Sequence, residues 1–71
     1  MNNLDLKKRI IALINEGIIT DPEILNILEE FEITGEINLR TKMSIDNQNT
    51  IKELVKYFKN NPDTSYLDFM A

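Results

Sequence analysis

The sequence predicts a mainly α fold: a small three-helix domain with an N-terminal antiparallel helical hairpin, a short strand or extended link, a third helix and a brief C-terminal turn. Three stretches carry apolar residues at helical spacing, two threonines followed three residues later by glutamate mark helix starts, and the segment before the third stretch alternates apolar with polar residues. No linker divides the 71 residues, so we expect residues 1–71 to form a single small helical domain.

The first helix is predicted over residues 4–16. Its apolar residues recur at helical spacing, and Gly17 stands where a residue in the left-handed conformation closes a helix. Ile18 then falls at the position whose side chain packs back onto Leu13 in a Schellman motif.

The apolar residues of this first helix cover about 180° of its circumference, whereas one core needs a stripe of only ~100°. With no cysteine for a disulfide, a chain of this length is stabilised by very regular packing or by self-association. We therefore predict a homodimer with a contact surface formed by Leu4, Ile11 and Ile18.

The second helix is predicted over residues 21–33, ending by Gly35. Thr20 and Glu23 have the spacing of a capping box, and Pro22 is tolerated in a first helical turn. Because the connection from the first helix is short, the two helices should fold back as an antiparallel hairpin.

Residues 37–45 alternate Ile, Leu, Thr or Met with polar residues, a pattern typical of a half-buried strand. An irregular extended link is the alternative, because Lys, Asn and Asp are poor strand formers and a single strand has no ladder partner. A strand here would have to pair with a stub at 31–34 or with the same strand of a second subunit.

The third helix is predicted over residues 49–60, where Thr50 and Glu53 repeat the capping-box spacing and Asn60-Asn61-Pro62 ends the helix. In the tail, aromatic and apolar residues at i, i+3 and i+4 fit one more helical turn docked on the core: Tyr66, Phe69 and Met70.

Composition excludes several kinds of site. Without histidine or cysteine there is no imidazole base, no thiolate nucleophile and no nitrogen or sulfur ligand for zinc. Two glycines cannot form a Gly-rich phosphate loop. We expect no enzymatic activity, no cofactor and no metal site.

Charge is divided along the chain. Residues 16–36 hold seven carboxylates and no basic side chain, whereas residues 40–59 hold five of the eight Lys and Arg residues. The net charge of −4 argues against a generic nucleic-acid binder, because phosphate neutralisation supplies most non-specific affinity.

Four glutamates of the second helix are the candidate partner-binding residues. Glu29 and Glu32 share one face, and Glu30 and Glu23 share another. An acidic surface of this kind attracts a basic protein partner. The alternative is a solvated helix exterior whose early acids favour the helix dipole.

Residues 37–43, Ile-Asn-Leu-Arg-Thr-Lys-Met, followed by the helix at 51–58, resemble the start of a ribbon-helix-helix DNA-binding subunit. In that family two strands pair across a dimer axis and place alternate polar side chains in the major groove. The resemblance implies that the residues facing DNA are Asn38, Arg40 and Lys42. The chain departs from the pattern, because the second helix of that fold would have to fit into residues 64–71 and an acidic hairpin precedes the ribbon.

The function predicted from these features is that of a small non-enzymatic regulatory protein that binds another protein through its acidic helical hairpin. DNA reading through residues 38–42 is the alternative. The absence of cysteine fits a reducing compartment, and the apolar run at 10–14 is too short for a signal peptide or a membrane span, so we expect a cytoplasmic protein without membrane contact. Abundant Ile, Asn and Lys are typical of AT-rich coding sequences and favour a bacterial or phage source.

Overall fold

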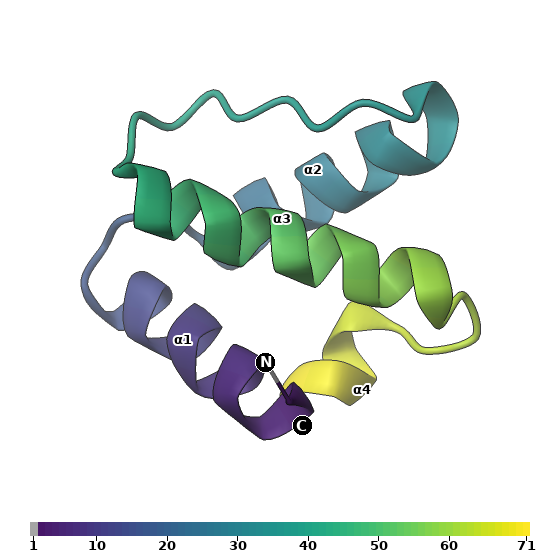
Figure 1. Cartoon of the computed structure of the whole chain (residues 1–71), viewed down its shortest axis with the longest axis horizontal. Coiled ribbons are helices and arrows are strands. Elements are labelled where there is room, and N and C mark those ends of the chain that lie inside the picture. Colours follow the sequence, from purple (N-terminus) through teal and green to yellow (C-terminus); the bar gives the residue numbers. More distant parts are fainter. Residues whose placement is uncertain (1) are drawn as a thin grey trace.

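The computed structural model describes residues 2–71 and shows four helices joined by short connections (Figure 1). These are α1 (Asn3–Asn15), α2 (Asp21–Thr34), α3 (Ile45–Asn60) and α4 (Tyr66–Met70). Helix α3 is the longest, with 16 residues, and both α1 and α2 pack against it. The structure confirms the small, mainly α fold class, and residues 2–71 contain no strand.

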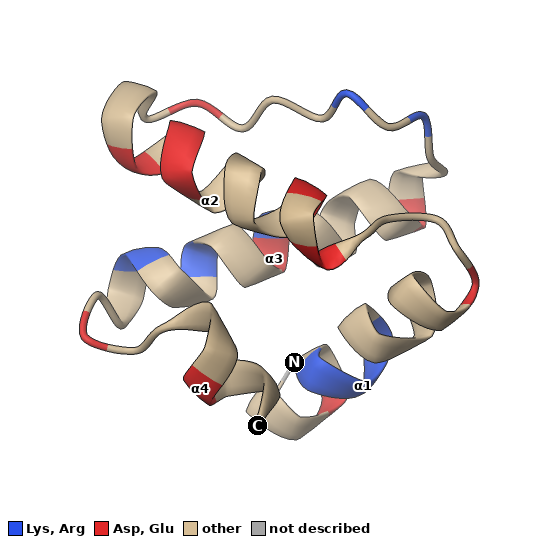
Figure 2. Ribbon diagram, turned by 180° about the vertical axis from the view of Figure 1, so that it is seen from behind, with Lys and Arg blue, Asp and Glu red and all other residues tan. Residues whose placement is uncertain are grey.

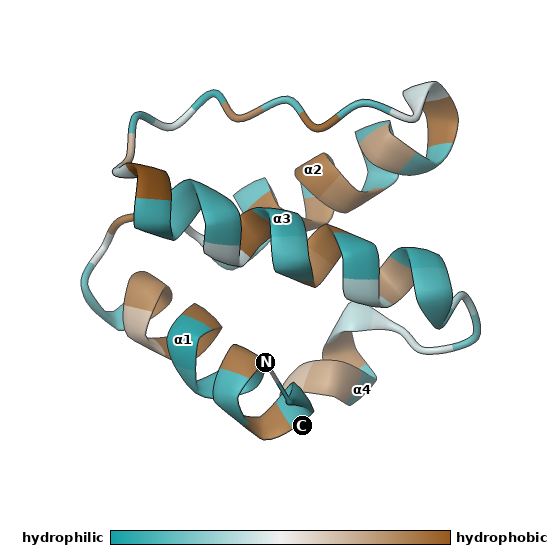
Figure 3. Ribbon diagram, in the orientation of Figure 1, coloured by the Kyte–Doolittle hydropathy of each residue, from teal (hydrophilic) through white to brown (hydrophobic). Residues whose placement is uncertain are grey.

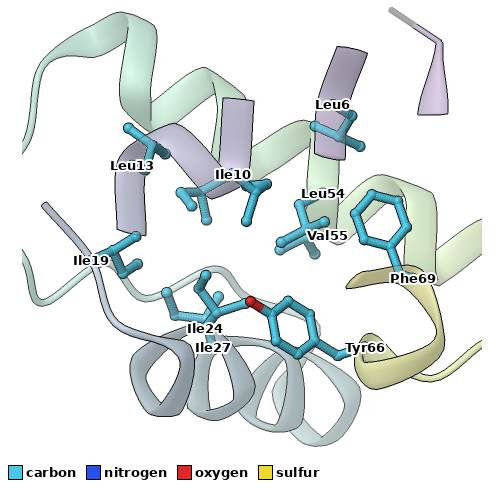
Figure 4. Close-up of a cluster of buried hydrophobic side chains, with 11 residues drawn as sticks. Leu6, Ile10, Leu13, Ile19, Ile24, Ile27, Leu54, Val55, Tyr66 and Phe69 are labelled. Carbon is cyan, nitrogen blue, oxygen red and sulfur yellow. The ribbon is translucent and has the colours of Figure 1, made fainter. Parts of the chain in front are cut away.

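A single hydrophobic core lies where the helices meet (Figure 4). Ile10 of α1 and Leu54 of α3 are fully buried, each with none of its surface exposed. Every helix contributes apolar side chains to this core, together with the connection between α1 and α2. The buried apolar residues are Leu6, Ile10, Leu13, Ile19, Ile24, Ile27, Ile51, Leu54, Val55, Tyr66 and Phe69.

The end of α1 has the predicted Schellman geometry. Gly17 has φ 73°, a left-handed conformation that an L side chain rarely adopts. The Ile18 amide donates to the Leu13 carbonyl at 3.0 Å, and the Gly17 amide donates to the Ile14 carbonyl at 3.0 Å. These two hydrogen bonds satisfy carbonyl groups that the helix end would otherwise leave unpaired.

Helix α2 begins and ends where the sequence predicts, within one residue. The Thr20 hydroxyl accepts a hydrogen bond from the Glu23 amide at 3.3 Å and donates to the Glu23 carboxylate at 3.0 Å. The Thr20 hydroxyl thus acts in both directions, as acceptor for the Glu23 amide and as donor to the Glu23 carboxylate. Gly35, at φ 73°, ends the helix and donates its amide to the Phe31 carbonyl at 2.8 Å.

The predicted hairpin of α1 and α2 is replaced by a different arrangement. The main backbone contacts of both helices are with α3 rather than with each other. In Figure 1, α3 runs across the molecule with α1 on one side and α2 behind it. The buried face of α3, formed by Ile51, Leu54 and Val55, is the surface that both apolar stripes cover.

Helix α3 begins at Ile45, earlier than the sequence predicted. Ser44 is its N-cap, and the Ser44 hydroxyl oxygen accepts from the Asn47 amide at 3.3 Å. Thr50, the predicted cap, is buried inside the helix and donates its hydroxyl to the Asp46 carbonyl at 3.1 Å. The capping-box spacing was misleading because serine, a residue equally suited to the N-cap position, stands earlier in the chain.

Residues 36–44, the link, form an extended connection, and the predicted strand is wrong. The alternation is nevertheless present in space, and Figure 3 shows it along the link. Every second side chain is half-buried and the others are exposed; the half-buried ones are Ile37, Leu39, Thr41 and Met43. A period of two thus marks an extended backbone lying on a surface, which here belongs to a helix and not to a neighbouring strand.

The predicted C-terminal turn is confirmed as α4, a five-residue helix that docks on the core. The Tyr66 hydroxyl donates to the Asp21 carboxylate at 2.5 Å, which ties α4 to the start of α2. Phe69 packs on rings of α3, with centroids 4.9 Å from Tyr57 and 5.6 Å from Phe58. Burial raises the pKa of the Tyr66 phenol well above its ordinary value, and the Asp21 carboxylate adds to the shift.

Burial predicts different outcomes for one substitution at two helical isoleucines. Ile51 is 1% exposed and Ile33 is 78% exposed. Ile51→Val should lower the free energy of unfolding by about 0.5–1.5 kcal/mol, because it removes a buried methylene. Ile33→Val should change it by less than ~0.5 kcal/mol. Urea denaturation followed by circular dichroism measures both, and equal losses would contradict this placement of the core.

The Tyr66 pKa predicts a loss of stability at alkaline pH. Because the folded-state pKa is raised, the neutral phenol stabilises the fold fully below the unfolded-state pKa of about 10, and this stabilisation is lost as pH rises through the folded-state pKa. Tyr66→Phe should be less stable at neutral pH but lose less stability from about pH 9.5 to about pH 11. Tyr57→Phe, which keeps the bond to Asp21, should retain the wild-type alkaline slope. Urea midpoints across this range test the assignment, which fails if Tyr66→Phe and the wild type run in parallel.

Candidate protein-binding groove

The acidic residues of α2 lie on two sides of the stripe that faces the core. Ile24 and Ile27 form the buried part of that stripe. Glu23 and Glu30 lie toward the link, and the other pair borders a groove between α2 and α3. The four glutamates chosen from the sequence therefore divide into the two pairs that helical spacing predicts.

The first pair holds the link against α2. One oxygen of Glu30 accepts from the Arg40 guanidinium at 2.7 Å, and the other accepts from the Asn38 side-chain amide at 3.3 Å. The Glu23 carboxylate accepts from the Thr41 hydroxyl as well as from its N-cap threonine. These hydrogen bonds, that from Thr41 first, lower the pKa of Glu23 below its ordinary value.

Two of the three residues of the DNA-reading hypothesis are engaged by the same contacts. Asn38 and Arg40 both donate to Glu30, although the Arg40 side chain keeps 72% of its surface exposed. Lys42 is exposed. The paired strand that would display these residues is absent from the described chain, residues 2–71. DNA reading through residues 38–42 stays an untested prediction.

An open groove of about 680 Å³ runs between α2 and the C-terminal half of α3. Its floor is apolar and includes the half-buried rings of Phe31 and Phe58. Glu29 and Glu32 line the α2 edge, and Lys59 lines the α3 edge. We call this the acidic groove; the lining residues are Leu25, Leu28, Glu29, Phe31, Glu32, Val55, Phe58, Lys59, Pro62, Thr64 and Tyr66.

The two carboxylates of the acidic groove face solvent. Glu29 and Glu32 are exposed, and the one ion pair within residues 2–71 joins Arg40 and Glu30 instead. Figure 2, seen from behind, shows acids along α2 and basic residues at the end of α3 that leads to α4. An apolar floor with charges only at its rim is suited to bind an amphipathic segment, because the floor excludes water from apolar side chains while the rim selects charge.

A second, smaller groove of about 400 Å³ adjoins the first, and Leu25 and Tyr66 line both. Ile11 of α1 and Leu67 of α4 also line it, and these side chains are large exposed apolar ones: Leu67 is 76%, Leu25 45% and Ile11 37% exposed. It therefore joins α1, α2 and α4 on one side of the molecule.

The predicted self-association residues lie in different environments. Ile11 lines the smaller groove, and Leu4, on the same helix, is 59% exposed. Ile18 is half-buried and packs against the core after the Schellman turn.

Sequence reasoning missed Leu25 and the contribution of α3 to the acidic groove. Leu25 stands off the stripe of Ile24 and Ile27, so its exposure follows from helical spacing alone. The facing wall, with Phe58 and Lys59, required knowledge of how α2 packs on α3. Within residues 2–71, no three or more acidic residues are placed so that they could hold a metal ion.

No protein-family model, no curated protein and no solved structure matches this chain. None of the helices in the described part of the chain is both long and apolar enough to cross a membrane.

The Glu23 pKa predicts how the contact between the link and α2 responds to acid. Because the folded-state pKa is lowered, the stabilisation is present above the ordinary value of 4.5 and is lost as pH falls through the folded-state pKa. Thr41→Val removes the largest cause of the shift, so the difference in unfolding free energy between the wild type and this variant should shrink as pH falls from about 6 to about 3.

Thr34→Val is the matched control for this prediction. The Thr34 hydroxyl donates to the Glu30 main-chain carbonyl at 2.8 Å, and a carbonyl does not titrate. The stability difference caused by Thr34→Val should therefore not depend on pH. Urea denaturation at several pH values tests both, and a constant difference for Thr41→Val would exclude Glu23 as its partner.

Proposed function

We propose that this protein is a small non-enzymatic regulatory protein that acts by binding another protein, and that the acidic groove is the binding site. The observation that carries the proposal is the combination of an apolar floor with two exposed carboxylates that the fold itself does not use. The occupant proposed is an amphipathic helix with a basic edge.

The floor supports a helical occupant. Apolar side chains from two helices line the groove, among them Leu28 of α2 and Phe58 of α3. A helix that lays apolar side chains at i, i+3 or i+4, and i+7 into such a groove buries them without leaving main-chain groups unpaired. Burying apolar surface supplies most of the affinity in this mode of recognition.

The rim supports a basic occupant. Glu29 and Glu32 stand three residues apart on α2 and so lie one turn apart along the groove. Lysine or arginine at matching spacing on the partner would meet both carboxylates. Charges at a rim mainly raise the association rate and select partners, and their effect decreases as salt is added.

A pair of designed peptides tests this proposal. The first is a helical peptide of leucine and lysine, about four turns long, with its leucines on one face; the second has glutamate in place of lysine. We expect fluorescence anisotropy to show tighter binding of the lysine peptide. Glu29→Lys with Glu32→Lys should weaken it about five- to tenfold at low salt, from two lost rim attractions of up to ~1 kcal/mol each, and less at ~0.5 M salt.

The matched control is Glu36→Lys with Glu53→Lys, which makes the same change in net charge. Both residues are exposed, and neither lines the acidic groove. Equal weakening by the two double variants would show only a general effect of net charge and would refute the groove. Retention on duplex DNA at low salt that Arg40→Ala abolishes would instead support the DNA-reading alternative.

A further inference from the structure

The exposed side of α1 matches the exposed side of α2 in both spacing and charge. On α1, Leu4, Lys8 and Ile11 stand at i, i+4 and i+7 and are all exposed. On α2, Leu25, Glu29 and Glu32 stand at the same spacing and are also exposed. Residues at this spacing form one stripe along a helix. One stripe is apolar and basic, and the other is apolar and acidic.

We propose that a second copy of this chain docks the exposed stripe of α1 onto the α2 edge of the acidic groove, and that two copies do so reciprocally in a closed, two-fold pair. In this pair Lys8 of each copy meets Glu29 of the other, and the apolar residues of the two stripes pack together. The proposal rests on the proposed function in one respect, because it assigns the same groove to an occupant of the same chemistry.

The fold supports a reciprocal pair because one residue of each stripe lines the same small groove. Ile11 and Leu25 line this groove together with Leu67 of α4. Figure 2 shows basic residues on α1 and acidic residues on α2 at opposite sides of this view. A two-fold rotation about an axis in the plane of such a face brings the basic side of each copy onto the acidic side of the other.

The size of the molecule is sufficient for such a contact. A standard interface buries about 800 Å² per partner, roughly one sixth of the 4852 Å² that this chain exposes. The side seen in Figure 2 is perpendicular to the shortest axis and spans the two longer extents, 28 and 25 Å. The apolar residues of the two stripes, Leu4, Ile11 and Leu25, are exposed to water in the single copy.

In this pair, the concentration of the protein itself regulates whether the groove can bind a partner. Glu29 cannot meet Lys8 of a second copy and a basic residue of another protein at once, so pairing and partner binding exclude each other. At high concentration the pair covers the groove, and dilution or a stronger occupant opens it.

Sedimentation equilibrium on charge-reversed variants tests the pair. Lys8→Glu and Glu29→Lys should each weaken self-association about tenfold or more at low salt, because each reversal places like charges together at both contacts. An equimolar mixture of the two single variants should recover pairing, since every contact then joins opposite charges. Arg9→Glu, an exposed change on α1 outside the stripe, should leave it unchanged. Helical circular dichroism confirms that each variant is folded.

Three outcomes would overturn the pair: a wild type that is monomeric at high micromolar concentration, no recovery in the mixture, or growth into species larger than two copies.

Binding of the leucine and lysine peptide distinguishes a failure of the pair from a failure of the proposed function. If the pair covers the groove, Lys8→Glu should bind the peptide more tightly than the wild type at concentrations where the wild type pairs, whereas Glu29→Lys should bind it less. A monomeric wild type that binds the peptide refutes only the pair. Pairing without peptide binding refutes only the proposed function.

Discussion

One apolar face of α3 holds the molecule together. Ile51, Leu54 and Val55 are almost completely buried, and α1, α2 and α4 each gain their own burial by covering part of that face and the side chains around it. A chain of 71 residues without disulfides has one core and no second layer. Damage to this face should therefore loosen all the other helices together, whereas damage to the outer side of α1 should not.

The position of the link also depends on the single core. This nine-residue extended segment pairs with no strand in residues 2–71, so its position depends on alternate side chains packed against the core and on polar contacts with α2. Glu30 and Glu23 supply those contacts through Arg40, Asn38 and Thr41. Asn38 and Arg40, which the sequence predicts to read DNA, thus bind Glu30, which the sequence predicts to bind a protein partner.

The parts of the fold that were predictable from sequence are those with a local physical cause. The Schellman end at Gly17 and the N-cap at Thr20 each depend on a few neighbouring residues, and the spacing of Tyr66 and Phe69 fixes which side of α4 is buried. The errors arose where the decisive partner is distant. Alternation in the link could not distinguish a strand ladder from the surface of α2, and the acidic groove depends on the packing of α2 against α3.

The start of α3 was predicted wrongly for a different reason, because two local signals for a helix start compete in this segment. Thr50 with its glutamate and Ser44 with its aspartate are both plausible helix starts, and the helix that begins after Ser44 includes Thr50 as a buried residue. Serine and threonine are both favoured N-cap residues, so the local signals alone do not decide between the two starts.

The two acidic sides of α2 have different roles: one holds the link in place, and the other is the proposed binding surface. Glu23 and Glu30 are used to hold the link, so exchanging them should disturb structure as well as charge. Glu29 and Glu32 are exposed and are outside the one ion pair found within residues 2–71, and Leu25 of the same helix is exposed as well. Leu25 is 45% exposed and lines both grooves. An occupant that covers Leu25 and meets the two free carboxylates accounts for all three residues at once.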